Sequence, residues 1–225
     1  MAKNTTTATK QEIELFQSWL ATEDPLSIAT HLYVDADAVF SAALLSVLKP
    51  DAQVLFVSAD IEIEDTRTLA VDLSKGDRAI KGLDVGSAFG LLVMGLKSID
   101  LPVYRALRRW AHQLNLTDSG KGCQDAVVLA ELVKAWRSLG LGDKGCFERA
   151  KELIAGKIKT ERSDAKQKQL AKSVMIENGV AVISNGSKIR GAHIFNQGAK
   201  VLIRESEFGH SIMISKELIK KGIKL

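Results

Sequence analysis

One stretch, residues 27–45, constrains the chain more than any other, because potential metal ligands interrupt an otherwise apolar segment. A short apolar run ends at His31, and Asp35 and Asp37 follow at the spacing His-x-x-x-Asp-x-Asp. Small and apolar residues at helical spacing come next, so the stretch predicts a strand, a polar loop and a helix. Open α/β sheets bind their ligands at such loops, where the strands end. We therefore expect a ligand-binding or catalytic site at this loop.

The residue types of this loop suit a hard divalent cation. An imidazole and two carboxylates on one tight turn are ligands that Mn²⁺ and Mg²⁺ accept. A plainer interpretation makes Asp35 and Asp37 turn and cap residues, since Asp37 is well placed to cap the following helix, and makes His31 a hydrogen-bonded residue at a strand end. The spacing leaves both interpretations open.

Two further apolar runs, residues 53–57 and 68–73, read as buried strands, and the second of them contains Asp72 at its end. The carboxyl ends of parallel strands meet at one edge of a sheet. We therefore expect Asp72 to lie near Asp35 and Asp37, although an Asp at a strand end is common without any such role.

The segment 30–42, Thr-His-Leu-Tyr-Val-Asp-Ala-Asp-Ala-Val-Phe-Ser-Ala, resembles the first motif of the DHH phosphoesterase superfamily. In that superfamily a His and two Asp at this spacing bind the catalytic metal. The resemblance implies an α/β fold, Mn²⁺ as the cofactor with Mg²⁺ as the alternative, and a ligand role for His31. It also implies that Asp35 and Asp37 act both as metal ligands and as catalytic residues.

Two more carboxylates match the superfamily by kind and place. Asp72 corresponds to the single Asp of the second motif, which gives it a metal-binding and catalytic role. Asp118, expected in a loop after helices, is the candidate for the metal-binding Asp of the fourth motif; taken alone, Asp-Ser-Gly is an ordinary turn. The third motif, Asp-His-His, has no counterpart, because residues 74–90 contain no His. Asp77 or Asp84 is the alternative ligand there.

The last fifty residues change to short β segments between turn residues, expected at residues 179–183, 191–195, 199–204 and 210–215. This part resembles a short form of the DHH-associated C-terminal domain, which in that family presents basic and polar groups to the substrate. The resemblance implies Arg190, Arg204 and His210 as substrate contacts.

The domain organisation expected from these patterns has four parts, in an α/β fold whose parallel sheet carries helices on both faces. They are a disordered tail at 1–9, a DHH-like α/β domain at 10–145, a linking helix at 146–173 and a small β-rich domain at 174–225.

The distribution of charge and the hydropathy of the chain limit the kinds of partner that it can bind. Residues 1–139 hold 14 Lys and Arg against 18 Asp and Glu, whereas residues 140–225 hold 17 against 9, so an acidic half precedes a basic half. This asymmetry fits a phosphate-bearing substrate such as a nucleotide or a short nucleic acid, although Lys-rich helices are often only solvated faces. No apolar run approaches the roughly 18 residues of a membrane span, and the N-terminal residues have no apolar signal core. We expect a cytoplasmic protein without a membrane partner.

Two functions are compatible with these features. The first is a metal-dependent phosphoesterase that hydrolyses a phosphodiester or phosphomonoester bond in a nucleotide, oligonucleotide or polyphosphate. The second is a binding or regulatory subunit with a degenerate DHH-like fold, and it is favoured by the missing Asp-His-His motif. The retention of the other five candidate ligands favours the enzyme. A homo-oligomer or a partner protein is compatible with either function.

Overall fold

The computed structural model describes residues 6–23, 26–76, 78–123, 128–184 and 186–224, and it divides into two compact units, Met1–Glu161 and Arg162–Leu225. The division falls within one long helix, α6 (Asp143–Ala171). The first helix, α1 (Thr7–Ala21), begins within residues 1–9, which the sequence predicts as a tail. Thr6 is the N-cap of this helix, because its side chain accepts a hydrogen bond from the backbone of Thr9.

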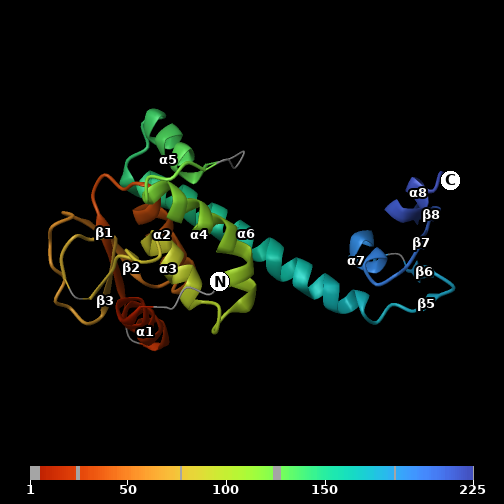
Figure 1. The fold of residues 1–225 in the computed structure, drawn as a ribbon, viewed down its shortest axis with the longest axis horizontal. Helices are drawn as coiled ribbons and strands as arrows, with labels where there is room; N and C mark the ends of the chain where they lie inside the picture. The colour runs from red at the N-terminus through yellow and green to blue at the C-terminus, as the bar shows by residue number, and fades with distance from the viewer. Residues whose placement is uncertain (1–5, 24–25, 77, 124–127, 185, 225) are drawn as a thin grey trace. The chain divides into compact units, whose positions relative to one another are not determined.

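The first unit is an α/β fold, as the sequence predicts (Figure 1). Its four strands are β1 (Ser27–His31), β2 (Gln53–Val57), β3 (Thr68–Val71) and β4 (Ala79–Ile80). Its helices after α1 are α2 (Ala36–Leu48), α3 (Ala88–Gly95), α4 (Leu101–Asp118), α5 (Leu129–Ser138) and the first part of α6.

The four strands form one parallel sheet in the order β2-β1-β3-β4. Strand β1 lies at its centre, with His31 paired to Val57 of β2 and Ala29 paired to Ala70 of β3. Because every strand runs the same way, the residues that follow β1 and β3 emerge at the same edge of the sheet. The topology therefore brings the polar loop after β1 beside the residues that follow β3.

The main core of the first unit packs helices against the sheet. Ile28 of β1 and Phe40 of α2 are fully buried in it, and α2 contacts β1, β2 and β3. The other face of β1 carries Ala29, which packs with the alanines of β3 and β4 and with Leu73. All three tryptophans, Trp19, Trp110 and Trp136, belong to the first unit and pack in or against the main core.

The second unit has a mixed sheet in the order β5-β6-β7-β8, in which only β6 and β7 are parallel. A separate small core, which includes Ile194 and Leu202, lies beneath it. The elements are β5 (Ile176–Glu177), β6 (Val180–Ile183), α7 (Gly191–Phe195), β7 (Val201–Ser206), β8 (Gly209–Ile214) and α8 (Lys216–Lys220).

One prediction for this unit is wrong, because Gly191–Phe195 is helix α7 and not a strand. The pairing of β6 with β7 explains the difference, since two consecutive parallel strands need a crossover between them. Helix α7 contacts β7 and supplies that crossover. Within the described residues, no helix combines the length and the apolarity that crossing a bilayer requires.

Candidate metal centre

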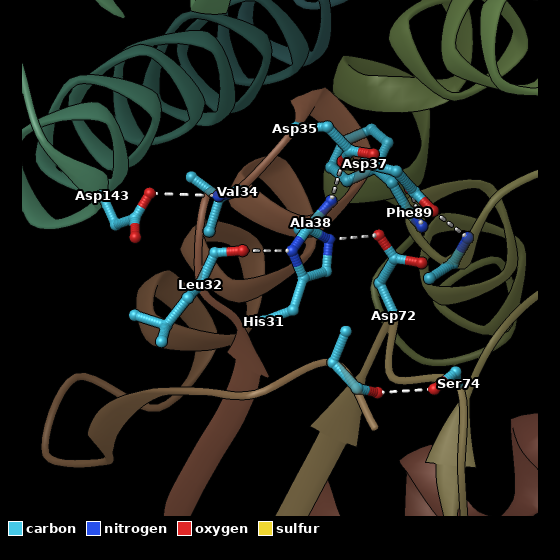
Figure 2. A network of polar contacts seen from close by, with 12 residues as sticks. His31, Leu32, Val34, Asp35, Asp37, Ala38, Asp72, Ser74, Phe89 and Asp143 are labelled. Atoms are coloured by element: carbon cyan, nitrogen blue, oxygen red, sulfur yellow. Dashed lines mark hydrogen bonds and ion pairs between the residues drawn. The ribbon is translucent and has the colours of Figure 1, made fainter. Parts of the chain in front are cut away.

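His31 and Asp72 meet at the edge of the sheet where β1 and β3 end. The ring of His31 lies between two acceptors, as Figure 2 shows: Nε2 is 3.3 Å from Oδ2 of Asp72, and Nδ1 is 2.8 Å from the carbonyl oxygen of Leu32. The hydrogen bond to Asp72 raises the pKa of His31 to about 9 against the opposing effect of burial. The metal-free imidazole is therefore protonated at neutral pH and donates from both nitrogens.

Asp35 comes from the loop that joins β1 to α2 and is the cap of that helix, because its Oδ1 accepts a hydrogen bond of 3.0 Å from the backbone of Ala38. The prediction that Asp37 caps this helix is wrong. One ligand atom each from His31, Asp35 and Asp72 lies within 4.8 Å of the other two. The fold therefore gathers three of the five predicted metal ligands into one group.

Asp37 is only 2% exposed and joins two helices. It stands in the first turn of α2, and its two oxygens accept hydrogen bonds of 2.7 Å from Ala88 and 2.8 Å from Phe89 at the start of α3 (Figure 2). Burial, followed by the negative charge of Asp72, holds the pKa of Asp37 well above its ordinary value. Asp37 is not part of the three-residue group, although the charge of Asp72 acts on it electrostatically.

Asp118 is expected in a loop, but the structure makes it the last residue of helix α4. Partial burial and the negative charges of Asp35 and Asp72 raise the pKa of Asp118 to about 6. The carboxylate thus interacts electrostatically with two members of the three-residue group without belonging to it. Asp37 and Asp118 thus add two carboxyl groups to the surroundings of the three-residue group, and the raised pKa of each shows that a further negative charge is disfavoured there.

The backbone is unusual at the same place. In the described ranges, three residues other than glycine have a positive φ, namely Tyr33 (57°), Asp72 (54°) and Asn178 (49°). Tyr33 lies between His31 and Asp35, and Asp72 is itself a member of the three-residue group. Such conformations cost free energy and persist where surrounding contacts enforce them, often at functional sites.

The alternative ligand Asp84 is engaged elsewhere, since its Oδ2 accepts hydrogen bonds from the hydroxyls of Thr6 and Thr9. Asp77, the other alternative, lies outside the described residues. No described residue of the 74–90 segment therefore joins the group of three possible ligands.

The three predicted substrate contacts belong to the second unit. Arg190 precedes α7, and its Nη1 lies 3.3 Å from Oδ1 of Asp164. Arg204 on β7 donates to the carbonyl oxygens of Ser187 (3.1 Å) and Ile189 (2.7 Å), so it holds the loop before α7. His210 on β8 is exposed.

The comparisons with known proteins identify weak likenesses only. No family model matches the chain, and no curated protein matches it. Among solved structures, RecJ from Thermus thermophilus in complex with Mg²⁺ is 12% identical, with a TM-score of 0.36 over 93% of this chain and 45% of RecJ. RecJ from the same organism in complex with Mn²⁺ is 11% identical, with a TM-score of 0.35 over 93% and 47%.

An exopolyphosphatase-related protein from Bacteroides fragilis is 12% identical, with a TM-score of 0.31 over 90% of this chain and 82% of that protein. The chain spans less than half of the length of the two RecJ structures. Identities of 11–12% and TM-scores of 0.31–0.36 carry no argument about function, so the chemistry of the site is argued from the residues of this chain alone.

Proposed function

We propose that the chain is a metal-dependent phosphoesterase, which hydrolyses a phosphodiester or phosphomonoester bond in a nucleotide, oligonucleotide or polyphosphate. The observation that carries this proposal is the group of His31, Asp35 and Asp72, whose ligand atoms lie within 4.8 Å of one another where two parallel strands end. One imidazole and two carboxylates are ligands for Mn²⁺ or Mg²⁺.

The donor set fits such an ion in both geometry and charge. Ligand atoms bound to one ion at about 2.1 Å lie roughly 3 to 4.2 Å apart, so movements of less than about 1 Å would suffice here. The raised pKa values of Asp37 and Asp118 reflect burial and the repulsion between neighbouring carboxylates. A divalent cation relieves that repulsion, and binding it requires His31 to release its proton.

When bound, the ion supplies a nucleophilic water at neutral pH and neutralises charge on the phosphate oxygens. His31, Asp35 and Asp72 would hold the ion: His31 and Asp72 extend from paired strands, and Asp35 is held by its capping bond to α2. Arg190, Arg204 and His210 are the proposed contacts to the substrate. Arg204 also holds the loop before α7 through its bonds to Ser187 and Ile189, and Arg190 is bonded to Gln167 and Asp164 of α6.

A second candidate is a binding or regulatory protein that holds an ion or a phosphate without turnover. This candidate is favoured because both oxygens of Asp37 already accept hydrogen bonds from the start of α3. The described residues then offer one group of three possible ligands, which is enough for one ion. A two-metal mechanism needs a second set.

Calorimetric titration with Mn²⁺ tests the shared premise of both candidates. We expect the wild-type chain to bind Mn²⁺ and Asp35→Asn to bind it at least about tenfold more weakly. Asn is as good a helix cap as Asp, so this variant removes the charge and keeps the start of α2. Absence of binding by the wild-type chain would contradict the proposal.

Hydrolysis then separates the two candidates. The substrates are short RNA, single-stranded DNA, cyclic dinucleotides and polyphosphate, each with Mn²⁺ and with excess chelator. If the chain is a phosphoesterase, at least one of these substrates should be hydrolysed. Chelator should abolish that hydrolysis, and Asp35→Asn should reduce it. Binding of Mn²⁺ without turnover of any of the four supports the second candidate.

A further inference from the structure

The loop between the two ligands His31 and Asp35 is held by a residue from a distant part of the chain. Asp143, the first residue of α6, accepts two backbone hydrogen bonds from it, one from Tyr33 to Oδ2 (2.9 Å) and one from Val34 to Oδ1 (3.0 Å). Figure 2 shows the carboxylate of Asp143 facing Val34. Two of the three residues between the ligands are thus bound to one carboxylate.

Arg137, near the end of α5, completes this arrangement. Its Nε and Nη2 both donate to the carbonyl oxygen of Val34, at 3.2 and 2.7 Å. Nη2 also lies 2.7 Å from Oδ1 of Asp143, and the side chains of Arg137 and Asp143 are 32% and 16% exposed. Charged groups that share hydrogen bonds in a partly buried place form some of the stronger polar contacts in proteins.

These contacts explain the unusual backbone of Tyr33. A residue with a side chain rarely adopts a φ of 57°, and here the N–H of Tyr33 is directed at Asp143 in that conformation. The conformation of Tyr33 and Val34 determines where Asp35 stands relative to His31. The pair therefore acts on the spacing of the ligands without being one of them.

We propose that Arg137 and Asp143 are positioning residues for the metal centre, which set the separation of His31 and Asp35 and thereby its affinity for a divalent cation. This inference rests on the proposed function, since it requires that the His31, Asp35 and Asp72 group binds metal. Because α6 continues to Ala171, the ligand loop is also bonded to the first residue of the helix that enters the second unit.

The sequence gives little sign of this role. Asp143 stands in a glycine-rich break at the start of a long helix, where an acidic residue is ordinarily a cap. A purely structural ion pair predicts that its loss lowers thermal stability and leaves metal affinity unchanged. A positioning pair predicts a loss of affinity that exceeds any loss of stability.

Three variants of the full chain test the proposal by calorimetry with Mn²⁺ alone, and circular dichroism reports their folding. Asp143→Asn keeps the shape but offers one acceptor oxygen to two N–H groups, so we expect affinity to fall about 10- to 100-fold. Arg137→Lys keeps the charge but loses the paired donation to Val34, so we expect a smaller loss. Glu152→Gln breaks the exposed Arg149–Glu152 pair on the same helix and should leave affinity unchanged.

The outcomes separate this inference from the proposed function. If the wild-type chain does not bind Mn²⁺, the proposed function fails and the inference fails with it. If the wild-type chain binds and a folded Asp143→Asn protein binds equally well, only the positioning role is overturned. Should Asp143→Asn fail to fold, Arg137→Lys decides by the same criterion, since wild-type affinity in that variant overturns the positioning role.

Discussion

The two units each contain a histidine paired with an aspartate, and the pairs differ in what surrounds them. His31 and Asp72 lie 3.3 Å apart in the first unit, where Asp35, Asp37 and Asp118 add three more carboxylates to their surroundings. In the second unit His193 lies 2.9 Å from Asp164. There the aspartate also pairs with Lys168 at 3.2 Å and Arg190 at 3.3 Å.

The balance of charge separates the two pairs. Burial pushes the pKa of Asp164 upward, but hydrogen bonds from Lys168 and His193 outweigh it and bring the pKa below its ordinary value. Asp37 and Asp118 have raised pKa values, because burial and like charges act together on them. Asp164 is already balanced by a lysine and an arginine and bonded to a histidine, whereas four carboxylates with one histidine favour a cation.

A histidine–aspartate pair is therefore not a metal site by itself. In the second unit it joins helix α6 to helix α7, and in the first it lies where two strands end within a surplus of negative charge. The difference between the pairs gives four tests, which follow in order of decreasing effect.

The largest expected difference is in metal affinity. Asp72→Asn should weaken Mn²⁺ binding by at least about 100-fold, since it removes a proposed ligand rather than a partner of one. Asn tolerates a positive φ, so the backbone at this position can be kept. Asp164→Asn is the matched control and should bind Mn²⁺ as the wild-type chain does. Equal affinities in the two variants, measured by calorimetry, would remove the distinction between the pairs.

The next largest effect concerns stability. Asp37→Ala leaves the N–H groups of Ala88 and Phe89 without their buried acceptor, which should lower the free energy of unfolding by about 2 kcal/mol. Asp37→Asn keeps one acceptor oxygen and should lose less. Urea unfolding of the metal-free variants measures both values. A loss below about 0.5 kcal/mol in Asp37→Ala would show that the two bonds are not what joins α2 to α3.

A smaller effect is expected at the other pair. His193 is 8% exposed, so His193→Ala removes both a hydrogen bond to Asp164 and buried contacts of the ring. We expect a loss of about 1–2 kcal/mol, because Lys168 and Arg190 still neutralise the aspartate. Thermal unfolding followed by circular dichroism measures the loss, and Mn²⁺ affinity should stay unchanged. Weakened Mn²⁺ binding in this variant would contradict the structural role of the pair.

The smallest effect is a pH dependence of the metal-free chain. The pKa of His31 is raised from 6.5 to about 9, so the folded state holds this proton more tightly than the unfolded state does. Its contribution to stability is complete below pH 6.5 and is lost as the pH rises through 9. By linkage a shift of this size corresponds to about 3 kcal/mol at most, and solvent screening of the partly exposed pair reduces the value that is measured. Asp72→Asn should flatten the stability profile between these pH values, and an unchanged slope would exclude the hydrogen bond as the cause.

The parts of the site that sequence predicts best are those with local patterns. His31 and Asp35 lie at opposite ends of one short loop, and Asp72 follows a buried apolar run, so periodicity and the rule for parallel strands were enough to place them together. The α/β class of the fold follows from the same alternation of strands and helices, and the structure confirms it.

Long-range contacts were beyond the reach of those patterns. The partners of Asp37 lie 51 and 52 residues further along the chain, and Asp143 is 109 and 110 residues from the backbone groups that it binds. Helix α7 was missed because its five residues read equally well as a strand until the parallel pairing of β6 and β7 is known. Each miss is a case where tertiary structure decides the role of a residue.

The placement of the three tryptophans gives the two units different optical signals. Trp19, Trp110 and Trp136 all belong to the first unit, and residues 162–225 contain no tryptophan. Intrinsic fluorescence therefore follows the unfolding of the first unit alone, while far-ultraviolet circular dichroism follows the helices and strands of both. Coincidence of the two unfolding curves is one of the tests of two-state behaviour. In this chain the separation between those curves measures how far the second unit unfolds independently of the first.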